Sequence, residues 1–159
     1  MAGSLPFTSS IMTVKNDWID YNGHLNMAYY NVLFDTCVDE VHDELGLGLR
    51  YRQKTNVSTF SAEAHIIYLA ELLASDPVVI TCHLIDANTK ALHSFLEMRH
   101  ADKGTVSAVS EQMHLHVDLQ TKRVVPFPDS IQRKVDTMVE NHKSLAHSPH
   151  IGRVMGIRR

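Results

Sequence analysis

Hydrophobic positions recur at steps of three and four residues over one long stretch of the chain, which begins after Asn26. They are Met27, Tyr30, Phe34, Cys37, Val38, Val41 and Leu45. This spacing places the side chains on one face of an α-helix of about 20 residues. Asn26 suits the N-cap, because its side chain can accept a hydrogen bond from a backbone N–H one turn further on. Gly46 and Gly48 are predicted to end the helix.

Four strand-like runs follow this helix, over residues 59–69, 77–86, 91–100 and 106–119. Turn residues separate the runs, for example at 75–77, 86–88 and 102–104. Connections this short favour antiparallel pairs, because parallel pairs need long crossovers. A first strand is predicted over residues 11–19, after a loose lead-in at 1–10, and a modest helix is predicted over 130–142.

The order of these elements predicts an α+β fold. A single amphipathic helix must bury its apolar face, and the only large partner is the antiparallel sheet, which should wrap around the helix. The 159 residues are the size of one domain. We expect the core over about 11–125 and a C-terminal helix and tail over 126–159.

Composition narrows the class of protein. The chain is 44% hydrophobic and has a net charge of -3, so its overall charge does not favour binding to nucleic acid. No apolar run approaches the roughly 18 residues that a membrane span needs. The start of the chain lacks the pattern of a secretory signal. Cys37 and Cys82 fit no metal or redox spacing, so we interpret them as reduced core thiols of a cytoplasmic protein.

The segment "WIDYNGHLNMAYYNVLFD", residues 18–35, concentrates polar side chains at the entry to the long helix. The first backbone N–H groups of a helix lack internal partners and favour negative charge, so those near Met27 could hold an oxyanion. Asp20 beside them could act as a nucleophile or as a general base on water. This layout suits acyl transfer or hydrolysis. The alternative is that Asp20, Asn22 and Asn26 are only turn and cap residues and His24 a loop histidine.

The same segment resembles the signature of hotdog-fold acyl-CoA thioesterases of the 4-hydroxybenzoyl-CoA type. The residues in register are Asp20, Gly23, His24, Leu25, Asn26 and Tyr30, while Met27 departs from the commonest pattern. The resemblance implies a hotdog fold, with Asp20 as the carboxylate and the Met27 backbone N–H as the oxyanion donor. His24 and Asn26 would order the loop or the thioester. It also implies a homodimer, possibly a tetramer, with coenzyme A as part of substrate and product and no other cofactor.

Two further stretches are similar to the betainyl-CoA thioesterases of carnitine degradation: "E-x-H-I…L-x-E" at 63–71 and "D-A-N-T-K-A-L-H-S-F" at 86–95. A trimethylammonium group favours aromatic faces and a nearby carboxylate. The candidates for binding it are Trp18, Tyr21, Tyr29, Tyr30, Tyr68 and Glu63, although aromatic residues at these spacings can equally be core. Glu63 and His65 share one strand face, which either lines the substrate pocket at a dimer interface or is a solvated edge.

Other chemistries remain as alternatives. His114 and His116 share a strand face, so a zinc site is conceivable, but no further ligand is identifiable and we expect a solvent-facing pair and no metal. A hotdog enoyl-CoA hydratase and a non-catalytic acyl-CoA-binding module are the alternative functions. The prediction is an acyl-CoA thioesterase that hydrolyses a small acyl-CoA, with betainyl-CoA as the best candidate.

Overall fold

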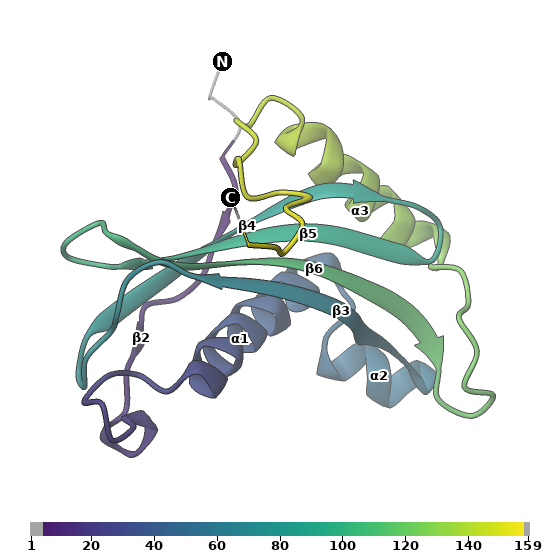
Figure 1. The fold of residues 1–159 in the computed structure, drawn as a ribbon. Helices are drawn as coiled ribbons and strands as arrows, with labels where there is room; N and C mark the ends of the chain where they lie inside the picture. Colours follow the sequence, from purple (N-terminus) through teal and green to yellow (C-terminus); the bar gives the residue numbers. More distant parts are fainter. Residues whose placement is uncertain (1–4, 158–159) are drawn as a thin grey trace.

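The computed structural model describes residues 5–157 and contains a curved antiparallel sheet around one long helix (Figure 1). Its elements are β1 (Phe7–Thr8), β2 (Met12–Thr13), the 3-10 helix η1 (Asn16–Trp18), α1 (Met27–Leu45), α2 (Leu49–Thr55), β3 (Val57–Tyr68), β4 (Pro77–Ala87), β5 (Ala91–His100), β6 (Val106–Asp118) and α3 (Asp129–His142). The predicted α+β arrangement is confirmed, and the four long strands and both predicted helices begin and end within two residues of their expected positions.

The sheet has the strand order β1-β4-β5-β6-β3, with β2 also paired to β4. All of these pairs are antiparallel. Within the described residues β3 pairs only with β6, so it is an edge strand, and a bulge between Ser61 and Glu63 interrupts its register. Helices α1 and α2 lie against one face of the sheet, and the C-terminal segment crosses the other face (Figure 1).

Helix α1 fills the concave side of the sheet because its apolar stripe faces the strands. Phe34 and Cys37 are fully buried and belong to one core with Ile80, Leu96 and Met98 of β4 and β5. The first residue of the predicted stripe, Met27, is an exception with 65% of its surface exposed. It stands at the first helical position of α1.

Two predictions about local structure are wrong. The expected strand over 11–19 is reduced to Met12–Thr13, because the chain then turns into η1, where Trp18 N–H donates to the Lys15 carbonyl at 3.1 Å. Helix α2 was not expected. None of its residues is buried, so it has no apolar stripe for the sequence to reveal. Gly46 ends α1 as predicted, but Gly48 is the N-cap of α2.

The expectation that His114 and His116 face solvent is also wrong. Both lie on β6, between β5 and β3, and expose 3% and 1% of their surface. The His116 ring contacts the Tyr51 hydroxyl at 3.0 Å and the Val125 carbonyl at 2.9 Å. His114 meets His42 of α1 edge to face, with ring centroids 5.3 Å apart. The helices therefore cover the face that sequence alone left open.

The two thiols are buried and free, as expected for core residues. Burial raises the pKa of both, that of Cys82 to about 12.

Across residues 5–157, every helix is either too short or too polar to cross a membrane.

Candidate active site at the N-terminus of α1

The loop that carries Asp20 is closed by main-chain hydrogen bonds. A bridge pairs Ile19 with Leu25, the Asp20 N–H donates to the His24 carbonyl at 3.0 Å, and the Gly23 N–H donates to the Asp20 carbonyl at 3.0 Å. Gly23 has a φ of 82°, a left-handed conformation that side chains with a Cβ rarely adopt. The loop thus has a defined shape that fixes where the Asp20 side chain begins.

The Asp20 carboxylate is half-buried and only partly engaged. Its Oδ1 accepts the Asn22 backbone N–H at 2.8 Å, and Oδ2 has no hydrogen-bond partner among the described residues. One oxygen therefore orients the group while the other is available to a water molecule or a thioester carbonyl.

The start of α1 offers a hydrogen-bond donor beside this carboxylate. Asn26 is the N-cap, as predicted, and its Oδ1 accepts the Ala28 N–H at 3.0 Å. The Asn26 N–H donates to the Trp18 carbonyl at 2.9 Å, which ties the cap to the preceding loop. Within the part of the chain that the structure describes, the Met27 N–H has no acceptor. A free amide at a helix N-terminus favours negative charge.

Asp20, His24, Met27 and Tyr30 line one cavity of about 360 Å³. Its other lining residues are Leu25, Tyr68, Leu69, Ala70 and Glu71. Leu25 belongs to the same loop as Asp20, whereas residues 68–71 come from the end of β3 and the loop after it, which reach the N-terminus of α1 across the fold. The main-chain bond from Leu25 N–H to the Leu72 carbonyl, 2.8 Å, holds the two loops together.

The walls of this cavity are ordered by contacts among its own side chains. His24 Nε2 lies 3.1 Å from Glu71 Oε2. The Tyr30 and Tyr68 rings meet edge to face with centroids 5.2 Å apart, and the Tyr68 hydroxyl donates to the Met27 carbonyl at 3.3 Å. Burial raises the pKa of both tyrosines, so their hydroxyls stay neutral. Glu71 was not predicted as a site residue; its only signal was its place in the stretch at 63–71.

The remaining predicted residues do not line this cavity in the single chain. Trp18 stacks on Tyr29 with ring centroids 5.3 Å apart, and Tyr21 is 97% exposed. Glu63 and His65 pair with Met113 and Glu111 of β6, on the sheet face opposite to α1. There they line a separate cavity of about 280 Å³, together with His93, Glu111 and Arg153.

Similarity to known proteins agrees with this geometry. A family model described as the thioesterase-like superfamily matches residues 14–135. The chain belongs to the thioesterase-like superfamily. It is 33% identical to the betainyl-CoA thioesterase of Pseudomonas aeruginosa over 144 residues, which cover 91% of each protein. It is 32% identical to the L-carnitine dehydrogenase/betainyl-CoA thioesterase of Rhizobium meliloti, and there it covers 92% of this chain but 29% of the relative.

Among solved structures, a hypothetical protein from Staphylococcus aureus in complex with CoA superimposes with a TM-score of 0.91 at 28% identity, covering 99% of both chains. The predicted hotdog fold and the predicted enzyme class, an acyl-CoA thioesterase, are confirmed by these matches. The assignment of Asp20, His24, Asn26 and Met27 to the reaction stays a prediction.

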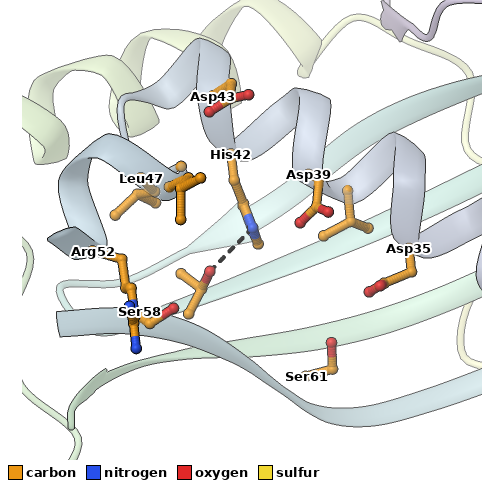
Figure 2. Close-up of a pocket in the computed structure, with 12 residues that line it drawn as sticks. Asp35, Asp39, His42, Asp43, Leu47, Arg52, Ser58 and Ser61 are labelled. Atoms are coloured by element: carbon orange, nitrogen blue, oxygen red, sulfur yellow. Dashed lines mark hydrogen bonds between the residues drawn. The ribbon is translucent and has the colours of Figure 1, made fainter. Parts of the chain in front are cut away.

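A second cavity of this thioesterase, about 420 Å³, lies between α1, α2 and β3 (Figure 2). Three carboxylates at four-residue steps, Asp35, Asp39 and Asp43, extend along α1 beside it. Burial and the two neighbouring carboxylates raise the pKa of Asp39. The buried His42 also lines this cavity, and its Nδ1 lies 3.0 Å from the Thr59 hydroxyl. This cavity shares no lining residue with the Asp20 cavity.

Within residues 5–157, no group of three or more His, Cys, Asp or Glu side chains is arranged to hold a metal ion. The His114–His116 pair considered above is occupied by contacts with His42, Tyr51 and the Val125 carbonyl.

Proposed function

We propose that this thioesterase hydrolyses betainyl-CoA to betaine and CoA, with Asp20 activating the attacking water and the Met27 backbone N–H holding the oxyanion. The observation that carries the proposal is the meeting of a partly free carboxylate and a free helix N-terminal amide in one cavity. The betainyl-CoA thioesterase of Pseudomonas aeruginosa, similar over 91% of its length, supports the choice of substrate.

In the proposed reaction Asp20 takes a proton from water, and the water oxygen forms a bond to the thioester carbonyl carbon. The carbonyl oxygen becomes an oxyanion that accepts the Met27 N–H, aided by the positive end of the α1 dipole. The oxyanion then re-forms the carbonyl, the C–S bond breaks, and the carboxylic acid is released. The CoA thiolate takes the proton that Asp20 holds, which returns Asp20 to its carboxylate form. A direct attack by Asp20, which would form a mixed anhydride that water later cleaves, uses the same groups.

The remaining predicted residues take supporting roles. Asn26 would order the helix N-terminus through its cap bond, and His24 would order the loop through its carbonyl, which accepts the Asp20 N–H. Coenzyme A is part of the substrate and product, so the proposal includes no separate cofactor. It also includes a homodimer, for which the exposed edge of β3 is available in the described chain.

The test is CoA thiol release from a panel that contains betainyl-CoA, short straight-chain, 3-hydroxy and aromatic acyl-CoA thioesters. We expect betainyl-CoA to give the highest kcat/KM, and Asp20→Asn to lower kcat by at least about 100-fold, because it removes the base and keeps the shape of the side chain. Asp17→Asn, which changes an exposed carboxylate three residues earlier, is the matched control and should keep wild-type activity.

Each other outcome contradicts a different part of the proposal. Preference for another acyl group that is still lost in Asp20→Asn would overturn the substrate and keep the mechanism. Full activity of Asp20→Asn would overturn the mechanism. Tight acyl-CoA binding without turnover of any thioester would favour a binding module.

A further inference from the structure

Glu71, a carboxylate that the mechanism does not use, lines the Asp20 cavity from the loop after β3. We infer that Glu71, together with the Tyr68 ring, selects a positively charged acyl group. The inference rests on the proposed thioester hydrolysis in this cavity, and it adds a specificity-determining residue to that site.

The reach of a small acyl group decides which residues can recognise it. In a betaine-type thioester one methylene separates the carbonyl carbon from the quaternary nitrogen, a distance of about 2.5 Å from standard bond lengths and angles. A cation this close to the reacting carbon must lie in the same cavity as the oxyanion donor. Glu63 lines a different cavity on the opposite sheet face, whereas Glu71 shares the cavity with Asp20 and the Met27 amide.

The charges around the cavity favour a cation. Asp20 and Glu71 both line it, and no lysine or arginine is among the lining residues from the described part of the chain. The only basic side chain among these lining residues is His24, whose Nε2 lies 3.1 Å from Glu71 Oε2. A carboxylate-bearing acyl group would meet two negative charges and no fixed positive charge.

Glu71 is placed to meet the cation with its second oxygen. Oε2 is engaged by His24, and Oε1 has no hydrogen-bond partner among residues 5–157. The His24 contact engages one oxygen of the carboxylate, and 64% of the Glu71 side-chain surface is exposed.

The aromatic wall supplies the second feature that a quaternary ammonium requires. Tyr68 is fixed at both ends, because its hydroxyl donates to the Met27 carbonyl at 3.3 Å and its ring packs edge to face against Tyr30. Quaternary ammonium groups bind the faces of aromatic rings, where desolvation strengthens the attraction. The Tyr68 ring, which is held beside Met27, therefore lies next to the position that the acyl group would occupy.

The experiment compares betainyl-CoA with 3,3-dimethylbutyryl-CoA, in which a neutral carbon replaces the quaternary nitrogen at the same size. The readout is the ratio of the two kcat/KM values. We expect Glu71→Gln to lower this ratio by about tenfold or more, because a unit charge a few ångströms away is removed. Activity toward the neutral thioester should stay within about threefold of wild type. Tyr68→Leu should lower the ratio in the same direction.

Glu44→Gln is the matched control, since it removes an exposed carboxylate that does not line the Asp20 cavity, and it should leave the ratio unchanged. Two results would overturn the inference: a Glu71→Gln ratio equal to that of wild type, or an equal loss of activity toward both thioesters, which would indicate a role only in positioning His24. Failure of the proposed function is distinguishable, because wild type itself would then release no thiol from either thioester.

Discussion

At the scale of single residues, Asn26 connects helix stability to the proposed chemistry. Its side chain accepts the Ala28 N–H, its carbonyl accepts the Tyr29 N–H, and its own N–H donates to Trp18. By satisfying Ala28 and not Met27, the cap leaves one amide free at the position where an oxyanion would form. The same residue therefore caps the first turn of α1 and leaves free the amide of Met27, which lines the Asp20 cavity.

Asn26→Ala should lower the free energy of unfolding by about 1 kcal/mol, the usual cost of losing an N-cap side chain. It should also lower kcat, because the Met27 amide loses its fixed direction. Urea unfolding and thiol release measure the two effects. Asn22→Ala is the control: only its backbone N–H is used in the loop, so its side chain can be removed with little effect. Equal stability of the two variants would contradict the role of the cap.

At the scale of elements, the C-terminal end of α1 is set by the conformation of one residue, Gly46. Gly46 closes the helix at φ 84°, with its N–H donating to the Asp43 carbonyl at 3.0 Å. The next residue, Leu47, donates to the His42 carbonyl at 2.7 Å and is buried. This closure turns the chain directly into α2, which then forms one wall of the second cavity (Figure 2).

Gly46→Ala should destabilise the protein by about 1 kcal/mol, because a Cβ disfavours the left-handed conformation. Space is not the cause, since the nearest atom to an added Cβ is the Lys134 Nζ at 3.6 Å. Thermal and urea unfolding would measure the loss. Gly156→Ala serves as the comparison, because that glycine has open space around it and no positive φ. If both Gly46→Ala and Gly156→Ala had wild-type stability, conformational strain at the end of α1 would be excluded.

At the scale of the whole molecule, histidines are buried where the helices meet the sheet. His42 of α1 and His114 of β6 contact each other in the core, and the Nε2 atom of His114 is buried without a hydrogen-bond partner in the described structure. Burial lowers the pKa of His114 to about 4, and burial and the neighbouring His114 lower that of His42 to about 3. Both rings are therefore neutral in the folded protein at neutral pH.

Stability should consequently fall in mild acid. Below about pH 6.5 the unfolded chain binds protons at these two histidines and the folded protein does not. Each histidine then removes about 1.4 kcal/mol of stability per pH unit, until the pH reaches its folded pKa. Between pH 7.5 and 5 the pair should cost about 4 kcal/mol, measured by urea unfolding across this range.

His114→Phe tests the origin of this pH dependence. The substitution keeps an aromatic ring against His42, removes the unpartnered nitrogen, and leaves one titrating group where there were two. We expect stability at pH 7.5 that is unchanged or higher, and about half of the loss at pH 5. A pH dependence identical to that of wild type would assign the acid sensitivity to other groups.

The sequence by itself determined the parts of this protein that depend on local periodicity. The three- and four-residue spacing from Tyr30 to Leu45 specified α1, Asn26 and Gly46 specified its ends, and alternation with turn residues specified the four long strands. The loop motif around Asp20 specified the family and brought Asp20, His24 and Met27 together, because these residues are close along the chain. The hydrophobic pattern did not predict helix α2, because none of its residues is buried.

Tertiary structure alone decided which distant segments meet. The end of β3 reaches the N-terminus of α1 through the Leu25–Leu72 main-chain bond, and this contact places Tyr68 and Glu71 in the Asp20 cavity. The bulge and register of β3 place Glu63 on the opposite face. Burial of His114 and His116 likewise depends on helices that come from another part of the chain. Spacing along a sequence defines the face of one element, but the neighbour that covers this face is set only by packing of the whole fold.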